Sequence, residues 1–142
     1  MDETAYRQVL TTSIGRPCPF EKSILTCCAA CVLAEKHNVA EREVVACGES
    51  ESHALCVALR DALRHNFTFA VGRLHIDGPL PHAQEMRLQC GGLRGMQFTV
   101  DGTNEVNDVS LLVRQARRKF GELADYPYSQ IVHLAQVYYR AR

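Results

Sequence analysis

Cysteine is the residue type in this sequence with the clearest capacity for chemistry. Seven cysteines occur in 142 residues. Cys90 stands apart, and the others fall in the first part of the chain, at Cys18, Cys27, Cys28, Cys31, Cys47 and Cys56. Thiolates bind zinc and iron–sulfur clusters, and they also act as nucleophiles in redox reactions. An odd number of cysteines without an export signal argues against a disulfide framework and favours metal ligands or free thiols.

The spacing of the cysteines predicts that several thiols converge on one site. A helix from about Pro19 to His37 would present three thiols within about 100° of one face. Cys18 would lie in a proline-flanked loop before this helix, and Cys47 in the loop before a third helix that carries Cys56. If the two helices pack together, the expected ligands are Cys18, Cys31, Cys47 and Cys56, with Cys27 or Cys28 as an alternate or additional thiolate.

The spacing also bears on which metal is bound. Structural zinc sites usually combine two close pairs of ligands, whereas this sequence has one such pair, Cys28 and Cys31. Dispersed thiols on helices and loops fit an iron–sulfur cluster better, and a 4Fe–4S cluster takes four thiolates. The sequence therefore predicts an iron–sulfur cluster, with zinc as the alternative cofactor.

Other interpretations of these residues remain open. Free cysteine packs well as a small apolar residue, so Cys28 and Cys56 also fit a plain core. A thiol redox pair would use Cys28 and Cys31. The glycine-rich stretch Cys90–Gly95 would let backbone N–H groups approach a cluster or an anion, with Cys90 beside it, or it forms an ordinary turn. His53 precedes Cys56 by three residues and is a further, weaker ligand candidate.

These residues predict a small cytoplasmic iron–sulfur protein that transfers electrons or senses redox state, oxygen or iron, with a redox or regulatory protein as its partner. No nucleophile–base–acid set is evident, so an enzyme is not the expected class. The first alternative is a zinc-stabilised helical interaction module. Its binding surface for protein or nucleic acid would be the tyrosine-rich end or the basic run Arg114, Arg117, Arg118 and Lys119. The weaker alternative is a thiol redox protein.

Composition limits the remaining choices. Sixteen basic residues balance sixteen acidic ones, so the total charge gives little support to nucleic-acid binding. No apolar run is long enough to cross a membrane, and the acidic start Met1–Thr4 does not resemble a secretion signal. We expect one domain over 1–142, with a cysteine-rich metal-binding half at 15–66 and a helical half at 103–142. The last helix offers a surface for a homodimer.

The apolar periodicity predicts a mainly α, compact domain of about five helices. They are expected at about 2–12, 19–37, 50–66, 104–120 and 127–140. Leu55, Leu59 and Leu63 would form the buried stripe of the third helix. The segment 67–100 has two interpretations, a small β-hairpin that turns at Gly91–Gly92 or further helix.

Overall fold

The computed structural model describes residues 15–70 and 80–138. This part of the chain is mainly helical with one small antiparallel hairpin, so the predicted fold class is confirmed. The helix expected at 2–12 lies outside the described residues. In chain order the elements are α2 (Glu21–Leu25), β1 (Ala34–Val39), β2 (Arg42–Cys47), α3 (Ser50–Ala70), α4 (His82–Met86), the π-helix η1 (Arg87–Gly91), α5 (Gly92–Asp101), α6 (Val109–Phe120), the 3-10 helix η2 (Leu123–Asp125) and α7 (Tyr128–Tyr138).

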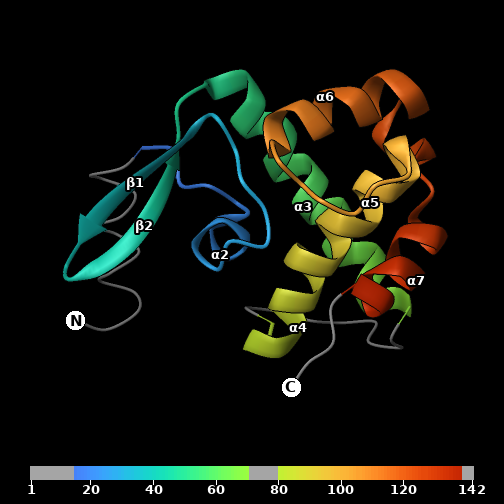
Figure 1. The fold of residues 1–142 in the computed structure, drawn as a ribbon, viewed down its shortest axis with the longest axis horizontal. Helices are drawn as coiled ribbons and strands as arrows, with labels where there is room; N and C mark the ends of the chain where they lie inside the picture. Colours follow the sequence, from blue (N-terminus) through green and yellow to red (C-terminus); the bar gives the residue numbers. More distant parts are fainter. Residues whose placement is uncertain (1–14, 71–79, 139–142) are drawn as a thin grey trace.

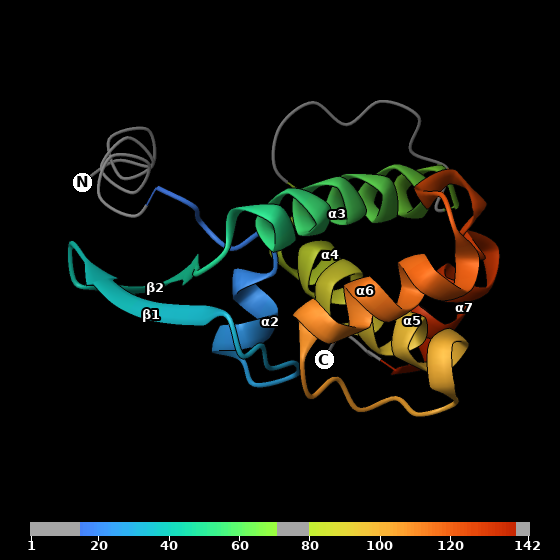
Figure 2. The same ribbon diagram turned by 90° about the horizontal axis from the view of Figure 1, so that it is seen from above.

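The helices and the hairpin form two distinct parts of the molecule. Helices α3 to α7 pack into one body, and the hairpin extends away from one side of it (Figures 1 and 2). The short helix α2 lies between the two parts, and it contacts both β2 and the π-helix η1. This junction is where the cysteine-rich segments meet the helical body.

Helix α3 is the central element of the core. Its buried stripe follows the helical repeat through Cys56, Leu59, Leu63 and Phe67, while Leu55 lies half-buried at the edge of the predicted stripe. Facing it are apolar side chains of α6 and α7, which are Leu112, Val113, Ala116, Ile131 and Ala135. Within the described ranges, no helix combines the length and the apolar character needed to cross a membrane.

Of the two interpretations of the segment 67–100, the helical one holds where the structure describes it, and the hairpin at Gly91–Gly92 is not present there. Residues 82–101 run through α4, η1 and α5. The glycines allow close helix packing instead of a turn. A Cβ atom on Gly91 would lie 2.4 Å from the Ala135 carbonyl oxygen, and one on Gly95 would lie 2.9 Å from that of Ile131. Both contacts are shorter than van der Waals distance, so α7 can pack here only against glycine.

The second helix is much shorter than predicted. Helix α2 ends at Leu25, and Cys27 takes a left-handed conformation with φ 63°. The following segment pairs with the chain before α6, because Ala30 donates to the Val106 carbonyl at 3.1 Å and accepts from the Val109 N–H at 2.8 Å. Periodicity did not reveal this long-range pairing. Cys27, Cys28 and Cys31 therefore do not share one helical face.

The hairpin occupies the region predicted to end the second helix. Strands β1 and β2 pair along their full length, from Ala34 with Cys47 to Val39 with Arg42. The turn residues Ala40 and Glu41 both have positive φ, at 51° and 68°. Two consecutive positive φ angles match the type I′ turn, which suits the right-handed twist of a hairpin. The hairpin thus returns the chain to place Cys47 at the junction.

Candidate metal centre

Four free cysteines line one small pocket at the junction between the hairpin and the helices. They are Cys18, Cys31, Cys47 and Cys56, the four ligands expected from the sequence. Cys56 is buried and the other three are half-buried. The four residues come from four separate segments, so the fold itself brings them together.

Cys18 and Cys47 are placed by neighbouring backbone segments. The Cys18 N–H donates to the Val45 carbonyl, and the Cys47 N–H donates to the Arg16 carbonyl, each at 2.8 Å. Residues 16–18 thereby run antiparallel beside the end of β2, with Pro17 bridged to Ala46. This pairing fixes both thiols at one edge of the hairpin.

Cys31 and Cys56 approach the pocket from the helical side. Cys31 lies in the turn before β1, where its carbonyl accepts from the Ala34 N–H at 3.2 Å. The Asp108 carboxylate holds this turn in place, since it accepts from the Val32 N–H at 3.2 Å and from the Cys31 thiol. Cys56 lies on the buried face of α3.

The walls of the pocket are largely apolar. Phe20, Ile24, Ala46 and Val109 contribute to the lining, and all four are buried. The free space between the side chains is about 20 Å³. His53 also lines the pocket, but its Nε2 lies 2.9 Å from the Pro17 carbonyl oxygen, a hydrogen bond that holds the loop before Cys18.

Burial strongly affects two of the four thiols. Desolvation raises the pKa of Cys18 to about 12; the Phe20 N–H opposes this rise, and the nearby Cys31 and Cys47 add to it. Desolvation likewise raises the pKa of Cys56 to about 12, followed by repulsion from the other three cysteines. Both thiols are protonated at neutral pH without a metal. The four cysteines line the same pocket, so ionisation of one thiol disfavours ionisation of its neighbours.

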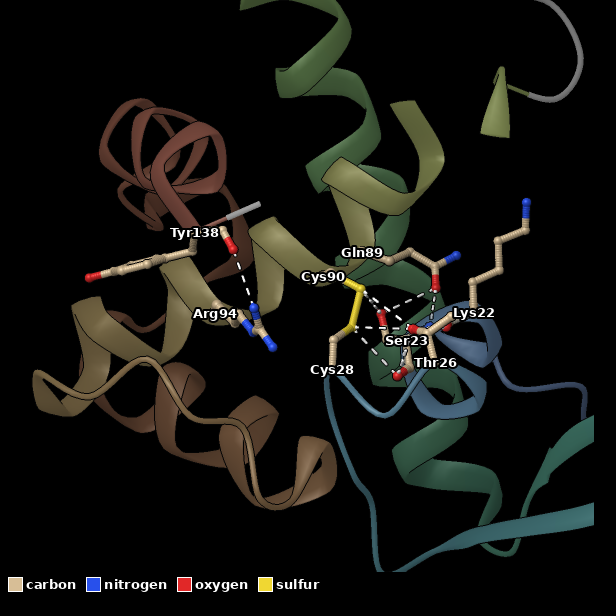
Figure 3. Close-up of a disulfide and its surroundings, with 8 residues drawn as sticks. All are labelled: Lys22, Ser23, Thr26, Cys28, Gln89, Cys90, Arg94 and Tyr138. Atoms are coloured by element: carbon tan, nitrogen blue, oxygen red, sulfur yellow. Dashed lines mark hydrogen bonds between the residues drawn. A yellow bond between two sulfur atoms is a disulfide. The ribbon is translucent and has the colours of Figure 1, made fainter. Parts of the chain in front are cut away.

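The other cysteines predicted as ligands lie outside this pocket. Cys27 is an exposed free thiol. Cys28 and Cys90 form a disulfide between the loop after α2 and η1, as Figure 3 shows. This bond differs from the expectation that the cysteines form no disulfides, and it pairs Cys28 with Cys90 instead of with Cys31. Its two cysteines are 62 residues apart, which no local spacing pattern indicates.

Two carboxylates near the pocket were not identified from the sequence. The Glu21 side chain accepts from the Val45 N–H at 2.7 Å and so joins α2 to β2. Asp108 caps the start of α6 by accepting from the Ser110 N–H at 3.1 Å. An aspartate just before an apolar helical repeat is a recognisable capping signal, so Asp108 could have been found.

Two further observations bear on binding. Within residues 15–70 and 80–138, no three His, Cys, Asp or Glu side chains are positioned to hold a single metal ion, and this includes the four cysteines of the pocket. The basic residues Arg114, Arg117 and Arg118 line a shallow pocket together with Glu49 and Glu51. The face predicted for nucleic acid is therefore of mixed charge at this pocket.

In comparisons with known proteins, no protein-family model, curated protein or solved structure matches the chain.

Proposed function

We propose that this protein binds an iron–sulfur cluster through Cys18, Cys31, Cys47 and Cys56. The observation that carries the proposal is that four free thiols from four segments line one apolar pocket. A 4Fe–4S cluster requires four ligands, usually thiolates, in a protected setting. When bound, the cluster would supply one-electron redox chemistry.

The four thiols are suitable ligands for such a cluster, but the pocket is smaller than the cluster. The free volume of about 20 Å³ holds little more than one water molecule. A cluster therefore requires the thiols to move apart as it binds. Cys31 and Cys47 are half-buried and belong to a turn and a strand end, so they are the side chains with room to move.

The position of the pocket supports electron transfer or redox sensing. Val32, next to Cys31, is 76% exposed, so a group bound at Cys31 would lie close to the protein surface. Electron exchange and contact with a redox or regulatory protein both require such proximity. The apolar walls would tune the reduction potential by limiting solvent access.

Structural zinc is the second candidate, and the small free volume favours it. A single ion needs less space than a cluster, and four thiolates are a usual ligand set for tetrahedral zinc. The four thiols would still have to move together to hold the ion, because no three of the described side chains are positioned for one metal. In this case the metal would join the hairpin to the helical body and stabilise an interaction module.

The deciding experiment is metal analysis of protein purified without oxygen. We expect iron and acid-labile sulfide in equal amounts, with broad visible absorption from thiolate-to-iron charge transfer. Serine variants of each pocket cysteine should lose most of the iron. Cys27→Ser is the matched control and should retain it, because Cys27 lies outside the pocket.

If the protein contains zinc and no iron, and the same four variants lose the zinc, the zinc candidate replaces the cluster proposal. Protein that takes up neither metal under reducing conditions would contradict both, and the four thiols would then be core residues.

A further inference from the structure

A second sulfur site lies apart from the four-thiol pocket, at the Cys28–Cys90 disulfide. A pocket of about 500 Å³ opens beside it, within the size range of small-molecule sites. Its lining includes Cys27, Cys28, Arg94, Asn104 and Glu105. Cys90 does not line this pocket and is only 1% exposed. Cys28 therefore borders the pocket and is half-buried, whereas Cys90 is buried.

The surroundings of the buried sulfur suit a leaving thiolate. The Thr26 hydroxyl oxygen lies 3.8 Å from Cys90 Sγ, and the Ser23 hydroxyl oxygen lies 4.0 Å from it (Figure 3). In the disulfide form the Thr26 hydroxyl donates to the Lys22 carbonyl at 2.7 Å, and the Ser23 hydroxyl donates to Gln89 Oε1 at 3.4 Å. Rotation of either hydroxyl towards Cys90 Sγ would stabilise the negative charge that develops when the sulfur–sulfur bond breaks. The same Thr26 hydroxyl lies 3.7 Å from Cys28 Sγ.

The backbone on both sides of the disulfide is unusual. Cys90 belongs to the π-helix η1, and such segments occur frequently at functional sites. Cys27, next to Cys28, has a left-handed conformation that is uncommon for a residue other than glycine. Both features are of the kind that cluster at functional sites.

The charges of the pocket indicate which thiol it would accept. The Arg94 guanidinium is half-buried beside the disulfide and is oriented by a 3.3 Å hydrogen bond to the Tyr138 carbonyl. Arginine binds carboxylates through planar, charge-assisted hydrogen bonds. Glu105 on the same pocket matches an ammonium group. A small amino-acid-like thiol with both groups is complementary to this arrangement.

We propose that Cys28 and Cys90 form a thiol–disulfide exchange site for a small thiol that carries a carboxylate. The thiolate of this molecule attacks Cys28 Sγ, a new sulfur–sulfur bond forms, and the Cys28–Cys90 bond breaks. Cys90 leaves as a thiolate and takes a proton from solvent. A second small thiol then attacks the sulfur of the first and releases Cys28. Two small thiols are oxidised to one disulfide, and the protein disulfide is reduced to two thiols.

The test measures the rate at which the disulfide is reduced in the full chain, which keeps any metal that it carries after purification. A Cys27→Ser background removes the exposed neighbouring thiol. Reduced glutathione is the anionic probe, and cysteamine, which has an amine but no carboxylate, is the control. After correction for the fraction of each probe present as thiolate, we expect glutathione to react at least about tenfold faster than cysteamine. A tenfold difference in rate corresponds to the energy of about one charge-assisted hydrogen bond. Arg94→Gln should abolish this preference and Arg94→Lys should retain part of it.

Trapping identifies the attacked sulfur. With oxidised glutathione, Cys90→Ser should accumulate a mixed disulfide at Cys28, located by peptide mass spectrometry, whereas Cys28→Ser should leave the buried Cys90 unmodified. If either variant fails to fold, the Arg94 comparison on the native disulfide decides. Three outcomes would overturn the proposal. The first is an equal rate for both probes in the parent protein and in Arg94→Gln, and the second is modification at Cys90. The third is the absence of a Cys28–Cys90 bond in protein purified in air.

Discussion

Desolvation raises the pKa of two of the four pocket thiols. Cys56 is buried and Cys18 is half-buried, and both thiols have a pKa of about 12. If the pocket binds a metal as proposed, Cys18 and Cys56 must release protons as the metal enters, because metal binding needs thiolates. Metal uptake should therefore be faster and tighter as pH rises, until competing hydroxide limits it.

The same pKa values predict how the metal-free protein responds to alkali. The pKa of Cys18 and Cys56 rises from 9.0 to about 12 on folding. Between these values the folded chain binds more protons than the unfolded chain, so the free energy of unfolding falls as pH rises from about 9 to 12. Urea unfolding of reduced, metal-free protein across this range would measure the slope.

The contribution of Cys56 can be separated by substitution. Tyr128 has a pKa raised to about 12 by burial and adds to the same slope, so the comparison is between variants. Cys56→Ser should flatten the pH dependence, while Cys27→Ser, at an exposed position, should leave it unchanged. Equal slopes in all three proteins would contradict the assigned burial effect.

Among the elements, helix α6 and the Cys31 turn share one carboxylate. Asp108 accepts from the Ser110 N–H at the start of the helix and from the Val32 N–H in the turn. Although burial opposes its ionisation, hydrogen bonds from the Ser110 side chain, Val32 and Cys31 hold its pKa below the usual range. One side chain therefore links the start of a core helix to a proposed metal ligand.

We expect Asp108→Ala to lower the free energy of unfolding by about 0.5–2 kcal/mol, the usual loss for a helix cap. Asp108→Asn should keep most of the stability, because asparagine caps helices equally well. Thermal or urea unfolding of the two variants checks this. An alanine variant as stable as the asparagine variant would show that the cap contributes little.

The packing of α5 and η1 against α7 gives a second prediction at this scale. Gly91→Ala should destabilise the protein by about 1–3 kcal/mol, because the added Cβ overlaps the Ala135 carbonyl. Gly92→Ala is the matched control, since its Cβ would make an ordinary 3.6 Å contact with Leu63. Alanine also favours a helix, so this variant should be up to about 1 kcal/mol more stable. The measurement is urea unfolding of both variants, and similar destabilisation in the two would refute the close approach.

For the molecule as a whole, one covalent bond and one polar network join the cysteine-rich segments to the helical body. The Ser23 N–H donates to the Gln89 Oε1 at 3.1 Å, and Gln89 in turn donates to Glu85 at 2.8 Å. Arg60 of α3 pairs with the same carboxylate at 2.9 Å. The Cys28–Cys90 disulfide lies beside this network, so α2 is held to η1 in two ways.

Reduction of this disulfide should lower the stability of the whole molecule. The bond closes a loop with a sequence separation of 62, and a disulfide of this kind typically raises the free energy of unfolding of a protein by about 2–4 kcal/mol. Urea unfolding of metal-free protein with and without a strong reductant gives the difference. The Cys28→Ser/Cys90→Ser double variant is the control and should not respond to the reductant.

The sequence indicated the helices with long apolar repeats and missed the features that depend on distant contacts. Leu59 and Leu63 on α3, and Val109 and Leu112 on α6, follow the helical period and were recognised. The end of α2 at Leu25 was not recognised. The course of the chain after Leu25 depends on backbone pairing with Val106 and on the disulfide to Cys90, and both partners are distant in the sequence.

The candidate site was predicted from residue type, and its geometry was not. Cys18, Cys31, Cys47 and Cys56 do line one pocket, but Cys31 reaches it from the turn before β1 where a helix was expected, and Cys47 reaches it from the end of β2 where a loop was expected. A turn at Gly91–Gly92 and further helix both remained open, since a sequence does not show that a neighbouring helix needs the space of a missing Cβ at Gly91 and Gly95.

The Ala40–Glu41 turn is a point at which the protein can be modified without disturbing either sulfur site. Strands of six residues separate it from the pocket by about 20 Å at the usual rise per residue. Both turn positions have the positive φ that Asn-Gly adopts with less strain, so this replacement would tighten the hairpin. A peptide tag inserted between Ala40 and Glu41 would attach the molecule to an electrode or a sensor surface at a point about 20 Å from the four-thiol pocket.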